Sequence, residues 1–426
     1  MLDRPIAELA ALVRRREASP SGLVRASLER IERDAALGAY VTVLADDALA
    51  AARVAEAELG AGRDRGPLHG LPVALKDNVD TAGIPTTGGS AALRDRVPAA
   101  DAVAWSRWRA AGAVLVGKTS LHELAYRAPH PSFPFARNPR DPARTPGGSS
   151  SGSGVAVAAG HVVAALGTDT GGSVRIPAAL CGVVGIKPSR AFVERDGVIP
   201  LSRSLDAVGV LARDAADALA ALRALAPLAP AAASPRRVSL VAEPPSCAPC
   251  VRDALTRAAD ALASAGHAVT RRAAPDLDAG RRIHRRILGH EAYAEHHALL
   301  ERTGPLFRQA LLVGAAVSDA DYAEALRARG ALRADDLLGD ADVLLLPTTS
   351  DVAPAIDLAS GRAVGDPDLT RWTFAANLFD LPAVSVPAGE HDGLPVAVQL
   401  IGRPGSEAAL LDLARCVQAI RVTVRA

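Results

Sequence analysis

The sequence predicts an α/β protein, and three observations lead to this fold class. Short apolar runs typical of buried strands occur at 71–77 and 113–118. They alternate with segments such as 101–112, in which apolar residues recur at helical spacing. The chain has 426 residues, of which 49% are hydrophobic, so it can bury a large core. Strands that alternate with helices in this way are typical of a sheet covered by helices.

The elements follow in order along the chain. An apolar face with helical spacing begins at Ile6, and a second begins at Leu23 after a Ser-Pro-Ser break. The strand at 71–77 delivers Lys76 at its end, where α/β proteins place their chemistry. A helix is predicted from about 154 to 166. The remaining elements are strands at 183–188, 208–213, 342–347, 383–387 and 395–402, and a mostly helical region at 276–340.

The charge balance excludes two classes of partner. With 48 basic and 47 acidic residues the formal net charge is +1, so the chain offers no strong electrostatic surface to nucleic acid or to an anionic membrane. No apolar stretch approaches the length of a membrane span, and Asp3, Arg4 and Glu8 interrupt any apolar leader. We therefore expect a cytoplasmic protein without nucleic-acid or membrane partners.

The four cysteines predict no special chemistry. They are too few for a disulfide scaffold in a chain of this length. Cys247 and Cys250 form the only close pair, in CAPC, and a zinc site would need a second pair of ligands nearby. We assign this pair no role.

Lysine is unusually scarce in this chain. Only Lys76, Lys118 and Lys187 occur among the 48 basic residues, so arginine supplies the generic surface cations. A lysine retained against this bias can do what arginine cannot, because burial can remove the proton of an ammonium but not that of a guanidinium. The alternative is that all three are ordinary surface lysines.

Two tracts rich in serine and glycine are the clearest motifs. The first, TPGGSSSGSGVAVAAG at 145–160, is too short for a tether and runs into apolar residues, so it predicts a shaped loop rather than a connector without chemistry. The second, GTDTGGSVRIPAALCG at 167–182, lacks the ending of a phosphate-binding loop. Its adjacent glycines allow backbone N–H groups to converge beside Ser173, which becomes a candidate nucleophile.

A serine nucleophile needs a base. No histidine lies in a nucleophile-elbow context. Lys76, at the end of an apolar strand, can serve if burial lowers its pKa from about 10.4 to roughly 7–8. The residues themselves thus point to a serine–lysine pair.

Three tracts in this order resemble the amidase signature family, which hydrolyses carboxamides with a Ser-cisSer-Lys triad. They are LPVALKDN around Lys76, TPGGSSSGSGVAVAAG around Ser149 and GTDTGGSVRIPAALCGVVGIKPS around Ser173. The similarity extends over nearly the whole chain and is weakest at 220–340. It implies an α/β fold with a large, mixed, twisted β-sheet core flanked by helices on both faces.

The resemblance also implies one domain over 1–426. The Ala/Pro-rich stretch at 225–237 is predicted as a surface loop inside this domain, because strands and helices resume directly after it. The expected regions are N-terminal helices at 1–65, the signature core at 66–217, a variable and mostly helical substrate-side region at 218–340, and C-terminal core strands with a helix at 341–426.

The resemblance assigns roles to individual residues. Ser173 would be the nucleophile and Lys76 the base. Ser149 would follow a cis peptide bond with Gly148 and bridge the other two. The further implied roles are an oxyanion hole of backbone N–H groups from Thr170, Gly171, Gly172 and Ser173, ordering of that loop by Asp169 and Arg175, substrate contacts from Tyr126 and Ser150, and structural roles for Lys118 and Lys187.

The implied reaction is acyl transfer without a metal or an organic cofactor. Neutral Lys76 takes a proton by way of Ser149 from Ser173, which attacks the amide carbon, and water later releases the acid. The partner is a small-molecule amide that the sequence does not name, and a homodimer is left open.

Three functions are consistent with this resemblance. They are a stand-alone amidase acting on a small carboxamide, an A-type glutaminase subunit of an amidotransferase, and a non-enzymatic binding protein on an amidase scaffold. The loop YRAPHPSFPFARNP at 126–139 departs from the pattern of many members and favours the first function over the second. The intact triad argues against the third.

Overall fold

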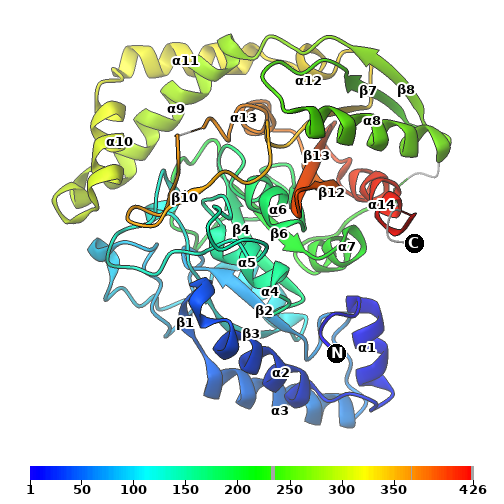
Figure 1. The fold of residues 1–426 in the computed structure, drawn as a ribbon. Coiled ribbons are helices and arrows are strands. Elements are labelled where there is room, and N and C mark those ends of the chain that lie inside the picture. Colours follow the sequence, from blue (N-terminus) through cyan, green and yellow to red (C-terminus); the bar gives the residue numbers. More distant parts are fainter. Residues whose placement is uncertain (232–235, 366, 424–426) are drawn as a thin grey trace.

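The computed structural model describes residues 1–231, 236–365 and 367–423, and one large β-sheet runs through it (Figure 1). Its strands are β1 (Tyr40–Val43), β2 (Pro72–Lys76), β3 (Val114–Thr119), β4 (Ala164–Asp169), β5 (Val184–Lys187), β6 (Ala207–Ala212), β7 (Arg237–Val241), β8 (Ala268–Arg272), β9 (Val343–Pro347), β12 (Ala383–His391) and β13 (Leu394–Gly402). The 11 strands have the order β1-β3-β2-β4-β6-β5-β12-β13-β9-β7-β8.

The sheet is mixed, because β2 runs parallel to β3 and β4 whereas β4 and β6 are antiparallel. A separate small hairpin is formed by β10 (Ile356–Asp357) and β11 (Arg362–Ala363). Alternating strands and helices with one extensive mixed sheet confirm the fold class predicted from the sequence.

Helices connect most of the strands. Among the described residues, none of them combines the length and the apolar composition that crossing a bilayer requires. They are α1 (Ile6–Arg14), α2 (Pro20–Arg33), α3 (Ala45–Gly60), α4 (Val103–Ala110), α5 (Ser151–Ala158), α6 (Arg175–Cys181), α7 (Ala215–Arg223), α8 (Pro249–Ser264), α9 (Asp278–His296), α10 (Pro305–Ala315), α11 (Asp319–Ala331), α12 (Ala334–Leu338), α13 (Phe374–Leu378) and α14 (Glu407–Thr423).

Alternate residues of the central strands face two hydrophobic cores. In β2, Val73 and Leu75 belong to one core and Ala74 to the other, as the period of two along a strand requires. The first core includes apolar residues of α1, α4, α7, α8 and α14, and the second includes those of α2, α3, α5 and α6. Helices therefore flank both faces of the sheet.

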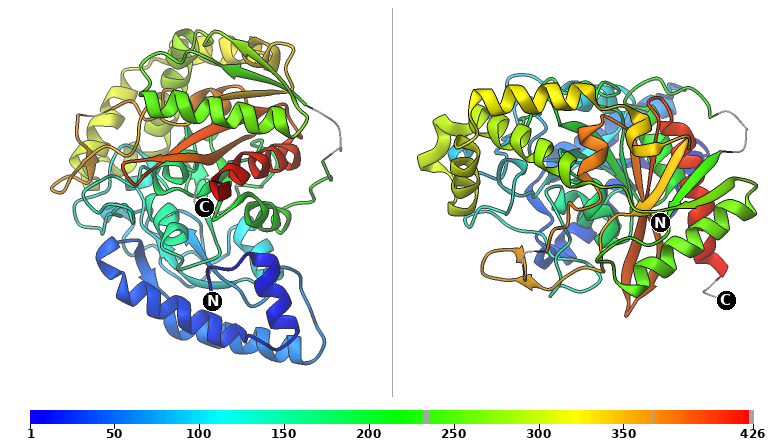
Figure 2. Two further views of the ribbon diagram at one scale, coloured as in Figure 1. Left: turned by 45° about the vertical axis from the view of Figure 1, so that its right-hand side comes forward. Right: turned by 90° about the horizontal axis from the view of Figure 1, so that it is seen from above.

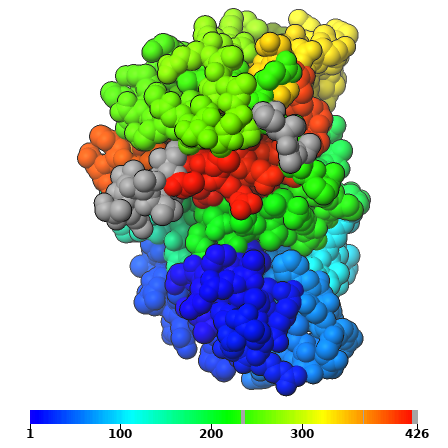
Figure 3. All heavy atoms as spheres, turned by 90° about the vertical axis from the view of Figure 1, so that its right-hand side faces the viewer, coloured from blue at the N-terminus to red at the C-terminus, as the bar shows by residue number. Residues whose placement is uncertain are grey.

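The two helical regions of the chain lie at opposite ends of the molecule. Helices α1 to α3 occupy one end and α9 to α11 the other in Figure 1 and in the left view of Figure 2. The C-terminal helix α14 forms a band on the surface between α7 and α8 (Figure 3). Because strands from residue 40 to residue 402 share one sheet, we propose that the chain forms a single domain.

The structure corrects two expectations about individual elements. The segment 154–166, expected as one helix, holds the end of α5 and the beginning of β4. Gly160 has φ +68°, a left-handed conformation that ends the helix and that glycine adopts readily. The short edge strand β1 lies within 1–65, where only helices were expected. The predicted loop at 225–237 includes 232–235, which lie outside the described residues.

The ends of β2 and β4 fix the position of the functional site. These strands are parallel neighbours, with Leu75 opposite Leu166, so their carboxyl ends lie at the same edge of the sheet. β2 ends at Lys76, and β4 ends at Asp169. The tract 145–160 contains α5, which packs against both strands. Both tracts and the predicted base therefore meet at one edge.

Candidate active site

Lys76 is fully buried at the end of β2 and contacts the first serine-glycine tract. Its Nζ donates to Ser149 Oγ at 2.9 Å and to Thr168 Oγ1 at 2.7 Å. Burial lowers the pKa of the Lys76 ammonium to about 7, although the negative charges of Asp206 and Asp169 oppose this shift. Near neutral pH a large share of this side chain is therefore an uncharged amine.

Ser149 follows a cis peptide bond with Gly148. The ring of His122 packs against Gly148 so closely that a Cβ there would lie 2.2 Å from ring atoms. The same residue is joined to the tract through its backbone N–H, which donates to the Ser149 carbonyl at 3.2 Å. Burial is the main cause that lowers the pKa of His122 to about 3, and the charges of Lys76 and Arg362 add to the effect. The ring is therefore neutral. The glycine thus admits a neutral ring beside the lysine.

Ser173 lies in the loop between β4 and α6, and this loop contacts the first tract. The backbone N–H of Ser150 donates to the Ser173 carbonyl at 3.1 Å. Ser149 and Ser173 line the same cleft, and Ser173 is the more exposed of the two. Within the described chain the Ser173 hydroxyl makes no hydrogen bond, whereas the Ser149 hydroxyl accepts one from Lys76.

Ser150 has a different place from the one expected. It was predicted to contact substrate, but its side chain is fully buried and its hydroxyl donates to the Thr168 carbonyl at 3.1 Å. The cleft is lined by its neighbour Ser149 instead. Tyr126, the other predicted substrate contact, does line the cleft. Because Ser150 begins the turn into α5, its side chain points into the protein.

The backbone N–H groups of the second tract divide into two sets. Those of Gly172 and Val174 donate to the carboxylate of Asp169, at 2.8 Å and 3.0 Å. Those of Thr170, Gly171 and Ser173 have no hydrogen-bond partner in the part of the chain that the structure describes, and all three residues line the cleft. Unpaired N–H groups beside a serine can bind a negatively charged oxygen.

A buried ion pair holds this loop. Asp169 and Arg175 are both fully buried, with Arg175 Nη2 2.8 Å from Asp169 Oδ1 and Nε 3.1 Å from Oδ2. Burial alone would raise the pKa of Asp169, but the charge and the hydrogen bonds of Arg175 lower it well below its usual range. The carboxylate is thus ionised and available to the N–H groups of Gly172 and Val174.

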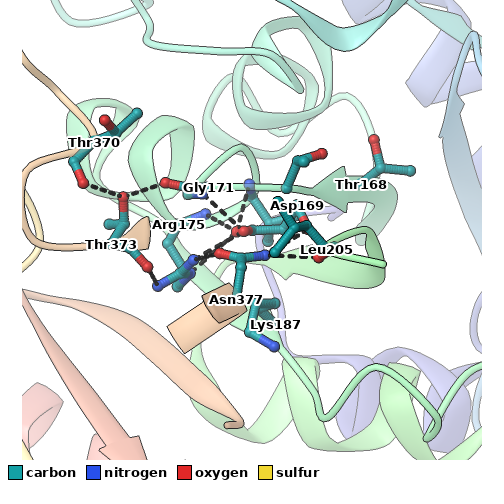
Figure 4. A network of polar contacts seen from close by, with 12 residues as sticks. Thr168, Asp169, Gly171, Arg175, Lys187, Leu205, Thr370, Thr373 and Asn377 are labelled. Carbon is teal, nitrogen blue, oxygen red and sulfur yellow. Dashed lines mark hydrogen bonds and ion pairs between the residues drawn. The ribbon is translucent and has the colours of Figure 1, made fainter. Parts of the chain in front are cut away.

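The ion pair is completed by residues from the C-terminal part of the chain (Figure 4). Arg175 Nη1 donates to the Thr373 carbonyl at 2.7 Å and to Gln399 Oε1 at 3.0 Å, and Nη2 donates to Asn377 Oδ1 at 2.7 Å. Asn377 Nδ2 donates in turn to the Asp169 carbonyl at 2.8 Å. Sequence reasoning missed these three partners. A glutamine inside the apolar run at 395–402 was the one available signal.

His284 on α9 packs against the second tract and was also missed. Its Nε2 lies 3.0 Å from the Thr170 carbonyl, and burial lowers the pKa of the ring to about 4. A neutral imidazole must donate in this contact, because the carbonyl can only accept. Thr373 Oγ1 donates to the next carbonyl, that of Gly171, at 2.6 Å. Both carbonyls are therefore held by side-chain donors.

The other two lysines are buried as well, so the interpretation of the three as surface residues is wrong. Lys118 donates to the Val79 carbonyl at 2.8 Å and lies 3.5 Å from Asp77 Oδ1. Lys187 donates to the carbonyl of its neighbour Pro188 at 2.7 Å, and burial lowers its pKa to about 8. Among the described cleft-lining residues neither of them occurs.

The cleft has a volume of about 310 Å³ and is bordered by both tracts, α9 and the segment after β11. Four arginines line it: Arg127, Arg281, Arg285 and Arg362. In the described ranges no three His, Cys, Asp or Glu side chains gather closely enough to hold a metal ion, and Cys247 and Cys250 are free thiols. The cleft thus contains the hydroxyls of Ser149 and Ser173 and unpaired backbone N–H groups of the second tract, and Lys76 is hydrogen-bonded to the first of these serines.

The chain is similar to known proteins over nearly its whole length. A family model described as Amidase matches residues 22–411. The A-type subunit of glutamyl-tRNA(Gln) amidotransferase from Anaeromyxobacter sp. (strain K) is 38% identical over 475 aligned residues, which cover 96% of this chain and 95% of that protein.

Solved structures show the same similarity in three dimensions. A crystal structure of an amidase has 33% sequence identity and a TM-score of 0.88, and the match covers 98% of this chain and 100% of that one. The native peptide amidase from Stenotrophomonas maltophilia has 30% identity and a TM-score of 0.84, over 98% of this chain and 96% of that one.

Proposed function

The chain belongs to the amidase family of enzymes that act on carbon–nitrogen bonds, and we propose that it hydrolyses a small carboxamide to a carboxylate and ammonia or an amine. One observation carries the proposal. Lys76 is buried, has a pKa of about 7 and lies 2.9 Å from Ser149 Oγ, and Ser149 shares the cleft with Ser173. An uncharged lysine beside a serine is suited to remove a hydroxyl proton.

In the proposed reaction Ser173 is the nucleophile. Neutral Lys76 accepts a proton from Ser149 while Ser149 accepts one from Ser173, and the Ser173 oxygen forms a bond with the amide carbon. Ser149 and Ser173 line the same cleft, and catalytic hydrogen bonds between such groups often form only when substrate is bound. The relay then protonates the leaving nitrogen as the C–N bond breaks. Water attacks the acyl ester, frees the acid and returns a proton to Ser173.

We propose that the oxyanion of the tetrahedral intermediate is bound by the N–H groups of Thr170, Gly171 and Ser173. These groups are unpaired in the described chain and line the cleft beside the nucleophile. The N–H group of Gly172 is not part of this oxyanion hole, because it donates to the Asp169 carboxylate at 2.8 Å. The Asp169–Arg175 pair thus orders the loop without touching the substrate.

The activity should rise with pH. Only the deprotonated form of Lys76 can act as a base, so kcat/KM should fall about tenfold per pH unit below pH 7 and reach a plateau above it. His122 and His284, with pKa values of about 3 and 4, stay neutral across this range. The measurement is kcat/KM between pH 5 and 9 with an amide that does not titrate there. A flat or falling profile through pH 7 would contradict the role of Lys76.

Substitution of His284 should lower kcat and leave KM nearly unchanged. In His284→Phe the ring shape is kept but the donor to the Thr170 carbonyl is lost, so the Thr170–Gly171 peptide is held less firmly. We expect kcat to fall about tenfold, in line with one weakened oxyanion contact, with little change in KM. His284→Gln, which keeps a donor, should recover part of the loss. Equal effects of both variants on KM would assign His284 to substrate binding instead.

The experiment that tests the proposed function is capture of the acyl-enzyme. Hydroxylamine should compete with water for it and give a hydroxamate from any amide that the enzyme accepts. A serine-directed phosphonate should add its mass to the intact protein, with peptide mapping placing the adduct on Ser173. The Ser173→Ala variant should show neither product. An adduct on Ser149 would mean that the nucleophile lies in the other tract, and turnover without hydroxamate would exclude the covalent route.

A second function is favoured by the similarity to the A-type subunit of glutamyl-tRNA(Gln) amidotransferase, which extends over 96% of this chain. In that case the same site would act as a glutaminase within an assembly. Ammonia release from glutamine should then be weak for the isolated chain and increase when partner subunits are co-expressed with it. Efficient hydrolysis of other amides by the isolated chain would favour the stand-alone amidase.

A further inference from the structure

Two arginines in the cleft have a positive charge that no other side chain balances. Arg127 and Arg285 are exposed and line the cleft. In the described part of the chain neither guanidinium donates a hydrogen bond or forms an ion pair. By contrast, Arg281 is bound to Asp368 and to the Arg371 carbonyl.

The described lining of the cleft is strongly biased toward positive charge. Among its described residues the one carboxylate, that of Asp368, is paired with Arg281, and Arg127 and Arg285 have no counter-charge in the described chain. The two histidines of the lining do not add to the charge because their pKa values are about 3 and 4. The charges of Arg127 and Arg285 therefore attract an anion to the cleft and disfavour a cation.

Arg127 and Arg285 come from different parts of the chain and line the same cleft as Tyr126. Arg285 lies on α9, whereas Arg127 follows Tyr126 directly and its guanidinium lies 6.0 Å from the centre of that ring. Burial raises the pKa of the Tyr126 hydroxyl, and the charges of both arginines oppose this shift. The ring itself is fixed edge-on against Phe307, at 6.4 Å between centroids.

The backbone of this segment is held in an uncommon conformation. Leu124, Ala125 and Arg127 have φ values of +46°, +65° and +62°. Non-glycine residues adopt such angles rarely, and they persist mostly where the surroundings enforce them, often at ligand-binding sites. The loop therefore presents Arg127 to the cleft at the cost of backbone strain.

We propose that the substrate amide also carries a carboxylate, which Arg127 and Arg285 bind together with the Tyr126 hydroxyl. A guanidinium offers a planar pair of donors that matches a carboxylate, and two of them from separate elements fix its position relative to the scissile bond. The inference rests on the proposed hydrolysis at Ser173. Half-amides of dicarboxylic acids are the simplest compounds of this class.

The test compares matched amides and matched variants. Each half-amide of a four- to six-carbon dicarboxylic acid is assayed for ammonia release beside the corresponding diamide, which has nearly the same shape but no charge. The wild-type kcat/KM should favour the half-amide by about tenfold or more, the value of one or two charge-assisted hydrogen bonds. Arg127→Met and Arg285→Met should each remove most of this preference, because they should slow the half-amide far more than the diamide.

The chain offers a control on the same helix. Arg282 is exposed on α9 but is not among the residues that line the cleft. The Arg282→Met variant should retain the full preference for the half-amide. A wild-type enzyme without such a preference, or arginine variants that slow both amides equally, would overturn the inference while leaving hydrolysis at Ser173 intact.

Binding separates the inference from the proposed function. In Ser173→Ala, calorimetry should show tighter binding of the half-amide than of the diamide. The difference in affinity should shrink at high salt. It should also shrink in the double variant that combines Ser173→Ala with Arg285→Met. If this holds but the wild-type protein releases no ammonia from any amide, the carboxylate site stands and the proposed hydrolysis fails. Equal binding of both amides would reject the site itself.

Discussion

Replacing Lys76 by arginine should lower kcat about 10³-fold or more, nearly as much as replacing it by alanine. Arginine keeps the positive charge but does not give up its proton at any pH that the protein tolerates, so it cannot serve as a base. The buried amine of Lys76 has a pKa of about 7 and can. The measurement is kcat for ammonia release at pH 8, where the wild-type lysine is mostly deprotonated.

A smaller replacement guards against misfolding. Arginine is larger than lysine and must fit where Lys76 is fully enclosed beside Thr168. Lys76→Met has nearly the same shape, adds no charge and should fold, as judged by circular dichroism and thermal unfolding, while losing activity to the same extent. If either variant turned over within tenfold of wild type, Lys76 would not be the base.

Breaking the ion pair below the second tract should produce the largest loss of stability. Arg175→Met leaves the Asp169 carboxylate buried without its counter-charge, and Asp169→Asn leaves the guanidinium in the same state. Each change should lower the free energy of unfolding by about 3–5 kcal/mol. Turnover should fall too, because the Gly172 N–H is held by the same carboxylate. Urea unfolding followed by fluorescence measures the first effect.

The double variant and a surface variant are the controls. Asp169→Asn combined with Arg175→Met removes both charges together, so it should cost clearly less than the sum of the single changes. Glu17→Gln, which breaks the exposed pair with Arg15, should leave unfolding unchanged within error. Additive effects of the two buried substitutions would show that the pair does not act as a unit.

The stability that Asp169 contributes also depends on pH. Its pKa is lowered in the folded protein, so the contribution is fully present above the ordinary pKa of a free aspartate. It is lost as the pH falls toward the lowered folded value. Asp169→Asn should therefore weaken the acid sensitivity of the protein.

Local patterns were sufficient to predict much of the sheet and the position of Lys76. The strand at 71–77 is apolar along its length and its end is marked by a lysine, so both the element and its special residue can be read from neighbouring positions. The boundary between α5 and β4 could not be read in this way. The residues around Val162 are apolar in either structure, and only the conformation of Gly160 separates the two elements.

The supporting residues of the site were beyond the reach of sequence patterns. Helical spacing predicts that 276–340 is helical, but it does not say which turn of α9 packs on the second tract. His284 and Arg285 are adjacent in sequence, yet one contacts the Thr170 carbonyl and the other faces the cleft without a partner in the described chain. Such pairings depend on how distant elements pack in the fold, and the period of a helix carries no information about them.

The burial of all three lysines determines how the folded protein reacts with amine-reactive reagents. None of these side chains is more than 1% exposed, and the sequence contains no others. Acylating labels and lysine-directed cross-linkers therefore find no ε-amino group on the native surface, although arginine side chains are exposed on it. Unfolding releases three such groups at once. Acetylation of lysine, followed by mass spectrometry, would thus measure the fraction of unfolded molecules, because folded molecules would gain almost no acetyl groups on lysine.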